Sequence, residues 1–152
     1  MVFRSRGRYA DPMSAVAFEN PPDEVIREIL ASPRRVAVVG CSPDPSRDSH
    51  RIARLLSEKG HAVFPVNPTS ASILGQRCYA ALADVPRPVG VVDIFRRSEF
   101  VGPIVDDAIA IGARVVWMQL GVIDVAAAER ARTAGLTVVM DRCPAIEYRR
   151  LF

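Results

Sequence analysis

Residues 35–49 read RVAVVGCSPDPSRDS, and this stretch decides the fold class. Its first part is a short apolar run, rich in valine, that ends at Gly40, which is typical of a buried parallel strand. Its second part is rich in Ser, Pro and Asp and leads into a predicted helix, with Ser49 as the expected N-cap and an apolar stripe that starts at Ile52. A buried strand, a polar turn and a helix in this order form the first unit of a parallel α/β sheet.

The same alternation continues along the chain. Further strands are predicted at residues 61–66, 89–95, 115–118 and 136–140, and further helices at residues 23–30, 98–112 and 124–133. Ser98 and Asp124 are the expected N-caps of the last two helices, and residues 144–152 form a short tail that either folds back or docks on a neighbour. We therefore expect an α/β fold with a doubly wound, Rossmann-like parallel sheet of five strands, in the order 3-2-1-4-5.

Length and charge indicate one folded domain. The 152 residues, 49% of them hydrophobic, can bury a core without disulfides. We predict a flexible arm at residues 1–20 and a folded domain at residues 21–152. The net charge of +3 equals the charge of Arg4, Arg6 and Arg8 in that arm, so we expect no nucleic-acid partner. No apolar run approaches the ~20 residues that cross a bilayer, so we expect no membrane partner and a cytoplasmic location.

The cysteines and histidines do not have the spacing of a metal site. Cys41, Cys78 and Cys143 are far apart and include no CxxC pair, and His50 and His61 are not spaced as metal ligands. We predict no metal and no disulfide framework. Cys143 is either a reactive thiol or a structural residue, and Cys41 is expected to fill space. His50 is expected to be an exposed residue of the first helical turn, with no nucleophile for a partner.

The turn after the first strand has the features of a phosphate site. Ligands of open α/β sheets bind beyond the carboxyl ends of the strands, and free N–H groups at a following helix N-terminus attract anions. Gly40 allows a tight turn, Ser42 adds a hydroxyl donor, and Arg47 adds a forked cation suited to phosphate. The alternative is a surface loop whose serines and aspartates only cap the helix. We favour the phosphate interpretation because the loop follows a buried strand.

The motifs for the common nucleotide cofactors are missing. Of a GxGxxG fingerprint only Gly40 is present, and no GxxxxGK[ST] occurs. The second strand ends in FPVNP, residues 64–68, without the carboxylate that binds the ribose of NAD. Among buried-looking residues, Trp117 is expected in the core, Phe95 fits a core position and an adenine contact equally well, and Asp93 is expected to hydrogen-bond a neighbouring loop.

Six motifs occur together and in order. They are VVGCSP at residues 38–43, FPVNP at 64–68, LGQRCY at 74–79, VDIFR at 92–96, VWMQLG at 116–121 and DRCP at 141–144. With them the chain, over about residues 23–151, resembles the small stand-alone CoA-binding domain proteins of bacteria and archaea. These are similar to the N-terminal CoA-binding domain of the succinyl-CoA synthetase α subunit.

This resemblance implies a set of contacts with coenzyme A. The phosphates would lie against Gly40, Cys41, Ser42 and Pro43 with Arg47, the adenosine part beside Asn67, Pro68, Thr69 and Ser70, and the adenine between Ile94, Phe95 and Arg96. Thr69 and Ser70 stand where many relatives have a lysine, so Arg47 or Arg96 is expected to supply that charge.

The expected function is therefore binding of CoA or an acyl-CoA without catalysis. The resemblance places the synthetase's phosphorylated histidine in a different domain, so it does not imply ligase chemistry. Two alternatives remain: a small NAD(P)-dependent oxidoreductase, and a regulatory subunit that senses acyl-CoA for a partner enzyme. A partner enzyme and a homo-oligomer are both left open.

Overall fold

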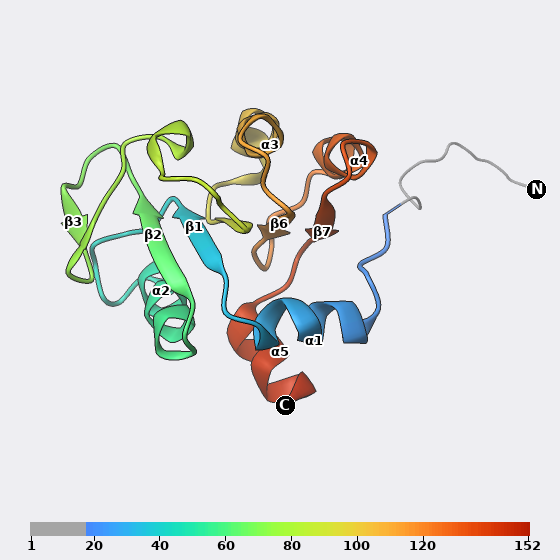
Figure 1. Cartoon of the computed structure of the whole chain (residues 1–152), viewed down its shortest axis with the longest axis horizontal. Coiled ribbons are helices and arrows are strands. Elements are labelled where there is room, and N and C mark those ends of the chain that lie inside the picture. Colours follow the sequence, from blue (N-terminus) through green and yellow to red (C-terminus); the bar gives the residue numbers. More distant parts are fainter. Residues whose placement is uncertain (1–17) are drawn as a thin grey trace, which may run out of the picture.

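The computed structural model describes residues 18–152, which form three layers around one parallel sheet (Figure 1). The five strands of the sheet are β1 (Arg35–Val39), β2 (Ala62–Val66), β5 (Val91–Ile94), β6 (Val115–Met118) and β7 (Thr137–Val139). Helices α1 (Asp23–Ala31), α2 (Asp48–Glu58) and α5 (Pro144–Leu151) cover one face, and α3 (Val101–Ala110) and α4 (Val125–Thr133) cover the other. The predicted doubly wound α/β fold is confirmed.

The predicted strand order is wrong in one respect. The order is β2-β1-β5-β6-β7, or 2-1-3-4-5 for the main strands counted along the chain, because β5 pairs with β1 and not with the far side of β2. No long helix joins β2 to β5. The connection holds a small hairpin of β3 (Ser72–Ile73) and β4 (Gln76–Arg77) and the 3-10 turn η2 (Leu82–Asp84). Leu82 packs with α3 and α4 in one core cluster, so this connection passes over β1 and the order reverses there.

Alternate residues of the strands serve two cores. Val36 and Val38 pack with α1, α2 and α5, whereas Ala37 and Val39 pack with α3 and α4. Every residue of β5 and β6 is buried, which explains why these strands read as continuous apolar runs. Trp117 is in the core as expected, and its indole N–H donates a 2.9 Å hydrogen bond to the carbonyl of Arg142.

Only one of the three predicted N-caps is correct. Asp124 caps α4, because its carboxylate accepts a 3.0 Å hydrogen bond from the amide of Ala127. Ser49 lies inside α2, and its hydroxyl accepts instead from the loop amide of Ser42. Ser98 lies in the 3-10 turn η3 (Ser98–Phe100), and its hydroxyl accepts from the amide of Ile123. Both serines thus fix a neighbouring loop and leave the helix ends uncapped.

Both ends of the described chain pack against the domain. The predicted tail folds back as α5, where Tyr148 donates a 3.0 Å hydrogen bond to the carbonyl of Leu30 at the end of α1. Of the predicted arm, residues 1–17 lie outside the described residues. Asn20, which that prediction included, exchanges two hydrogen bonds with the backbone of Met140.

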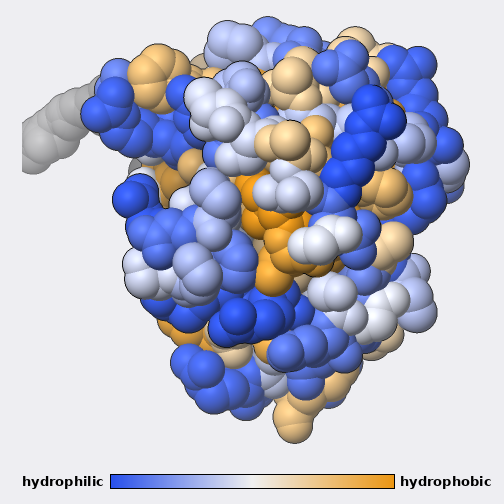
Figure 2. All heavy atoms as spheres, turned by 90° about the vertical axis from the view of Figure 1, so that its left-hand side faces the viewer, coloured by the Kyte–Doolittle hydropathy of each residue, from blue (hydrophilic) through white to orange (hydrophobic). Residues whose placement is uncertain are grey.

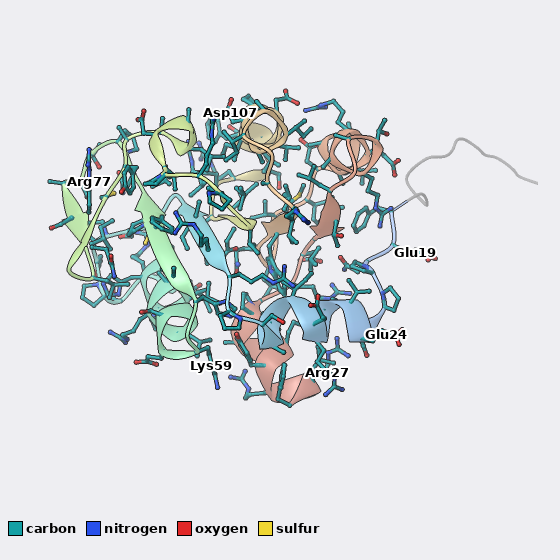
Figure 3. All side chains as sticks on the ribbon, in the orientation of Figure 1. Glu19, Glu24, Arg27, Lys59, Arg77 and Asp107 are labelled. Atoms are coloured by element: carbon teal, nitrogen blue, oxygen red, sulfur yellow. The ribbon has the colours of Figure 1, made fainter. Side chains whose placement is uncertain are left out.

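The surface carries the charged side chains. Charged residues such as Glu24 and Arg27 of α1 and Asp107 of α3 point outward from the two helical layers (Figure 3). The face at the left of Figure 1 is mostly hydrophilic, and hydrophobic residues show near its centre (Figure 2). None of the helices in residues 18–152 has the length and apolar content that a membrane span requires.

Candidate functional site: a groove at the carboxyl ends of the strands

A groove of about 820 Å³ lies at the carboxyl ends of β1, β5 and β6. From β1 the chain continues to α2 on one face of the sheet, and from β5 it continues to α3 on the other. The groove thus lies at the point where the strand order reverses, which is the usual ligand site of such sheets. It is lined by Arg47, Asp48, Arg51, Ile52, Leu55, Phe95, Arg96, Arg97, Gln119, Leu120, Gly121, Val122, Cys143 and Ala145.

The charged residues that line this groove are mostly cationic. Four arginines and one carboxylate line it. Arg51 pairs with Asp48, and the guanidinium of Arg96 lies 4.7 Å from the ring centroid of Phe100. Arg47 is exposed, and its guanidinium makes no ion pair or hydrogen bond with any residue from 18 to 152. Its charge is therefore available to an anionic ligand.

The N-terminus of α2 opens beside Arg47. No side chain of residues 18–152 caps this helix, and its first backbone hydrogen bond runs from the amide of Arg51 to the carbonyl of Arg47, at 3.1 Å. The amides of residues 48–50 precede that bond, so they have no partner within the helix. Free amides and the positive end of the helix dipole favour a phosphate at this position.

Hydrogen bonds to β2 and to the first turn of α2 hold the loop between β1 and α2. The amides of Gly40 and Cys41 both donate to the carbonyl of Val66. Gly40 has φ +82°, and a Cβ there would overlap the carbonyl oxygen of Phe95. Ser42 donates its amide to Ser49 and accepts with its hydroxyl from Asp44. Glycine is thus required by the close approach of two loops. The hydroxyl of Ser42, predicted as a donor, accepts from the amide of Asp44, and its O–H donates to no residue from 18 to 152.

The other predicted site residues surround the groove in different ways. The side chain of Asn67 donates a 2.8 Å hydrogen bond to the carbonyl of Cys41 and accepts from Thr69. This joins residues 67–70 to the first loop, where Pro68 and Thr69 are exposed and Ser70 is half-buried. Pro43 is exposed as well.

The three segments therefore come together, but only part of them lines the groove. Of the twelve predicted residues, Arg47, Phe95 and Arg96 are in the lining. Ile94 is fully buried in the core, so its side chain is out of reach of a ligand. The remaining eight belong to the loops at residues 40–43 and 67–70, which a hydrogen bond from Asn67 to Cys41 joins, and they do not line the groove.

Comparison with known proteins places the chain in a family. Residues 34–149, three quarters of the chain, match the model of the CoA binding domain. The chain belongs to the CoA-binding domain family. The uncharacterized protein YneT of Bacillus subtilis is 35% identical over 125 residues, which cover 82% of this chain and 93% of YneT. The expected resemblance to small stand-alone proteins of this family is confirmed.

Solved structures agree with this assignment. A hypothetical protein of Pyrococcus horikoshii is 40% identical with a TM-score of 0.82, over 86% of this chain and 92% of that one. The acetyl-coenzyme A synthetase 1 of Ca. Korarchaeum cryptofilum, in complex with phosphate and ADP, is 31% identical with a TM-score of 0.66. That match covers 76% of this chain but 27% of the synthetase chain. The CoA-binding domain thus occurs alone and as part of a larger CoA ligase.

The thiols of this CoA-binding domain protein differ in environment. Cys41 is fully buried, and burial raises its pKa to about 12. It therefore fills space, as expected, and stays protonated. Cys78 is buried, and burial also raises its pKa. Cys143 is half-buried and lines the groove. No cluster of metal-ligating side chains occurs within residues 18–152.

The expectation that His50 is exposed is wrong. His50 is 6% exposed, because the first turn of α2 buries both Ser49 and His50, and its Nδ1 atom has no hydrogen-bond partner among the described residues. A histidine enclosed in this way is not positioned to serve as a general base for a ligand in the groove.

Gln119 is a lining residue that sequence reasoning did not single out. It follows β6, is 5% exposed, and its Nε2 donates a hydrogen bond to Asp93 in β5. Asp93 was expected to bond a neighbouring loop, and Gln119 is that partner. Burial raises the pKa of Asp93 to about 7, although the hydrogen bond from Gln119 opposes the shift. A carboxylate inside an otherwise apolar strand was the signal that could have pointed to this pair.

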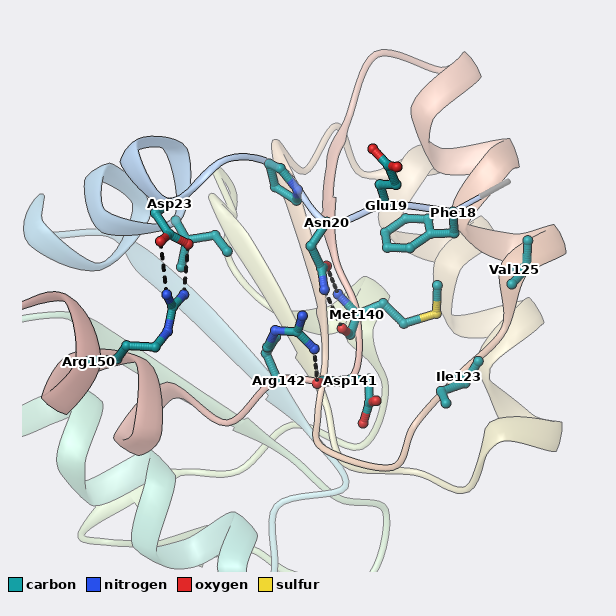
Figure 4. A pocket seen from close by; sticks show the side chains of 12 residues that line it. Phe18, Glu19, Asn20, Asp23, Ile123, Val125, Met140, Asp141, Arg142 and Arg150 are labelled. Atoms are coloured by element: carbon teal, nitrogen blue, oxygen red, sulfur yellow. Dashed lines mark hydrogen bonds and ion pairs between the residues drawn. The ribbon is translucent and has the colours of Figure 1, made fainter. Parts of the chain in front are cut away.

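A second hollow, of about 580 Å³, lies between residues 18–23, the turn after β7 and the start of α4 (Figure 4). Its polar groups are largely satisfied by each other. Arg150 binds both carboxylate oxygens of Asp23, at 2.8 and 2.9 Å. Asn20 binds the backbone of Met140, and Arg142 donates to the carbonyl of Asp141. We therefore take the groove, with its free arginine and uncapped helix, as the candidate site.

Proposed function

We propose that this protein binds coenzyme A or an acyl-CoA in the groove, with phosphates at the N-terminus of α2 beside Arg47. The observation that carries the proposal is the N-terminus of α2 beside Arg47: within residues 18–152 no side chain caps this helix end and none pairs with the guanidinium of Arg47. Coenzyme A carries three phosphates, and a site with four arginines and one carboxylate complements that charge. Membership in the CoA-binding domain family supports the same ligand.

The rest of the ligand would use the remaining surface. The adenosine part would lie against Asn67, Pro68, Thr69 and Ser70 and the Phe95–Arg96 edge, next to the phosphate loop. The pantetheine arm has methyl and methylene groups between its amides, and Leu120, Val122 and Cys143 offer apolar contacts for them in the groove. At residues 40–43 the amides of Gly40, Cys41 and Ser42 already donate to Val66 and Ser49, and Pro43 has no N–H, so the hydroxyl of Ser42 is the donor that we expect to face the phosphates.

We further propose that binding is not accompanied by catalysis, and that the protein acts in the cytoplasm. His50 is enclosed, Cys41 keeps its proton, and the chain matches only 27% of the synthetase that it resembles. Four arginines converge on one groove, and this arrangement suits a nucleotide better than a nucleic acid.

A partner enzyme would give such a protein a sensing role, and a search for co-purifying subunits would test this.

Calorimetric titration tests the proposed ligand. We expect CoA to bind the purified protein and NADH not to bind, because the site lacks the acidic ribose ligand of NAD proteins. Native mass spectrometry of freshly purified protein would show a retained CoA or acyl-CoA by its mass. Tighter binding of NADH than of CoA would overturn the proposal in favour of an oxidoreductase.

Arg47→Ala tests the position of the phosphates. Loss of a charged hydrogen bond should weaken CoA binding by about 1–3 kcal/mol. Arg54→Ala is the matched control, because Arg54 is exposed on the same helix and lines a different hollow. Equal affinity of both variants and the unaltered protein for CoA would show that the phosphates bind elsewhere.

A further inference from the structure

The buried pair of Asp93 and Gln119 reaches from the core to the groove. Asp93 is 1% exposed and lies in β5, and the amide nitrogen of Gln119 donates to its Oδ1 atom. Gln119 follows β6, the next strand of the sheet, and lines the groove. The proposed ligand would therefore contact a side chain whose other end is fixed by a buried carboxylate.

This contact fixes which end of the amide faces the groove. An ionised carboxylate only accepts hydrogen bonds, so the NH₂ end of Gln119 must turn to Asp93. The Oε1 atom then points away from Asp93. It accepts no hydrogen bond from any residue of 18–152. Among the described residues only His50 Nδ1 and Asp93 Oδ2 are polar side-chain atoms that are both fully buried and without a partner, so this oxygen is not fully buried. The small exposed part of Gln119 thus includes its carbonyl oxygen.

We infer that Asp93 is a positioning residue that presents the Oε1 atom of Gln119 to the groove as an acceptor for an amide N–H of the pantetheine arm. This inference rests on the proposed function. The neighbours of Gln119 in the lining, Leu120, Val122 and Cys143, suit the apolar parts of that arm, whereas the four arginines of the lining come from the start of α2 and the loop after β5. A fixed acceptor in apolar surroundings selects a donor, because a ligand without one leaves the oxygen unpaired.

Gln119→Met tests the acceptor, because methionine has a similar size and no hydrogen-bonding amide. We expect CoA to bind about 5- to 20-fold more weakly. Adenosine 3′,5′-bisphosphate, which lacks the pantetheine arm, should bind as it does to the unaltered protein. Unchanged CoA affinity, or an equal loss for both ligands, would overturn the inference. A lack of CoA binding by the unaltered protein would instead overturn the proposed function on which it rests.

Asp93→Asn tests the positioning role and does not remove the amide of Gln119. Asparagine can donate as well as accept, so the amide of Gln119 is free to turn either end to the groove. We expect a loss of about 2- to 5-fold in CoA affinity at pH 8.5. In a Gln119→Met background the same substitution should have no further effect, and a full additional loss there would show a merely structural role.

The pH dependence of CoA binding further separates a positioning role of Asp93 from a merely structural one. Protonated Asp93 resembles asparagine. The dissociation constants of the unaltered protein and of Asp93→Asn for CoA should therefore become equal, with a ratio that approaches one, as the pH falls from 8.5 to 6.5. Titration of the CoA phosphates is common to both proteins and cancels in this ratio. The titratable groups that face Asp93 are Cys41 and His61. Cys41 keeps its proton and burial lowers the pKa of His61, so neither changes charge substantially in this range. A ratio independent of pH would overturn the positioning role.

Discussion

The helices α2 and α4 begin at the same edge of the sheet, but their N-termini are capped differently. At α4 the carboxylate of Asp124 accepts from the third residue of the helix and closes its N-terminus. At α2 the residue in the same place is Arg47, which cannot accept a hydrogen bond, and no side chain caps the helix. One N-terminus is thus neutralised from within the protein, and the other leaves its partial positive charge to the groove.

The difference shows how a fold keeps a helix end open. Ser49 and Asp48 are good capping residues by type, but Ser49 accepts from Ser42 and Asp48 pairs with Arg51. Ser49 thereby fixes the loop before α2 to its own helix, and Gly40 fixes the loop to Val66 and lies against Phe95. Ser49 thus holds the loop in position, Asp48 pairs within the helix, and neither caps α2.

The largest effect is expected from Gly40→Ala, which breaks the packing that holds the open helix end. Alanine at φ +82° is strained, and its Cβ would overlap the carbonyl oxygen of Phe95. We expect a loss of about 2–4 kcal/mol in the free energy of unfolding, measured by urea denaturation, together with weaker CoA binding.

Gly60→Ala is the control for backbone strain alone. Gly60 has φ +98°, and no atom would lie within 4 Å of an added Cβ. We expect a loss of about 1 kcal/mol. Equal losses at the two glycines would mean that the contact between the loops after β1 and β5 has no energetic importance.

Arg47→Asp would turn the open end of α2 into a closed one. The new carboxylate stands at the N-cap position that Asp124 holds in α4, so the protein should gain about 0.5–1 kcal/mol of stability. The same change replaces a cation by an anion at the proposed phosphate position, and we expect CoA binding to weaken by about 2–3 kcal/mol. Thermal unfolding without ligand and calorimetry with CoA measure the two effects, and a parallel loss of both would contradict the comparison.

Asp124→Ala opens the closed end of α4. The amide of Ala127 loses its partner, so the free energy of unfolding should fall by about 1 kcal/mol. CoA affinity should stay the same, because Asp124 does not line the groove. Asp124→Asn, which keeps an acceptor at the cap, should restore most of the stability. A marked loss of CoA affinity in either variant would place the ligand nearer to α4 than we propose.

The strands of the sheet and the capped end of α4 could be predicted from the sequence. Apolar runs that end in turn residues gave the five strands, and a carboxylate before an alanine-rich helix gave the cap at Asp124. Strand order was not readable, because it depends on where the connection at residues 67–90 crosses the sheet, and its hairpin and 3-10 turn are too short to leave a periodic pattern.

The site was readable to a smaller extent. The arginine at residue 47 and the loop after β1 followed from the rule for parallel sheets. The uses of Ser42 and Ser49 could not be predicted, because each serine hydroxyl can accept from several nearby amides and tertiary packing decides between them. The orientation of His50 depends on the same packing. The pair of Gln119 and Asp93 joins residues 26 positions apart, which only the sheet register brings together.

The smallest expected effect is on stability and concerns His61, which contacts α5, a third helix that begins at the groove. The Nδ1 atom of His61 accepts a 3.0 Å hydrogen bond from the amide of Arg34. The neutral ring therefore carries its proton on Nε2 and donates it to Tyr148 of α5. Burial lowers the pKa of His61 below its ordinary value of 6.5, so the unfolded chain takes up a proton more readily than the folded one.

The stability that neutral His61 contributes is fully present above pH 6.5 and is lost as the pH falls below it. Burial shifts the pKa of Asp93 upward, so that group changes stability in the opposite direction, and the unaltered protein alone would show only the sum. The difference in unfolding free energy between the unaltered protein and His61→Phe cancels the contribution of Asp93. We expect this difference to shrink from pH 8 to pH 5.5, and a constant difference would show that His61 does not hold α5 through its neutral form.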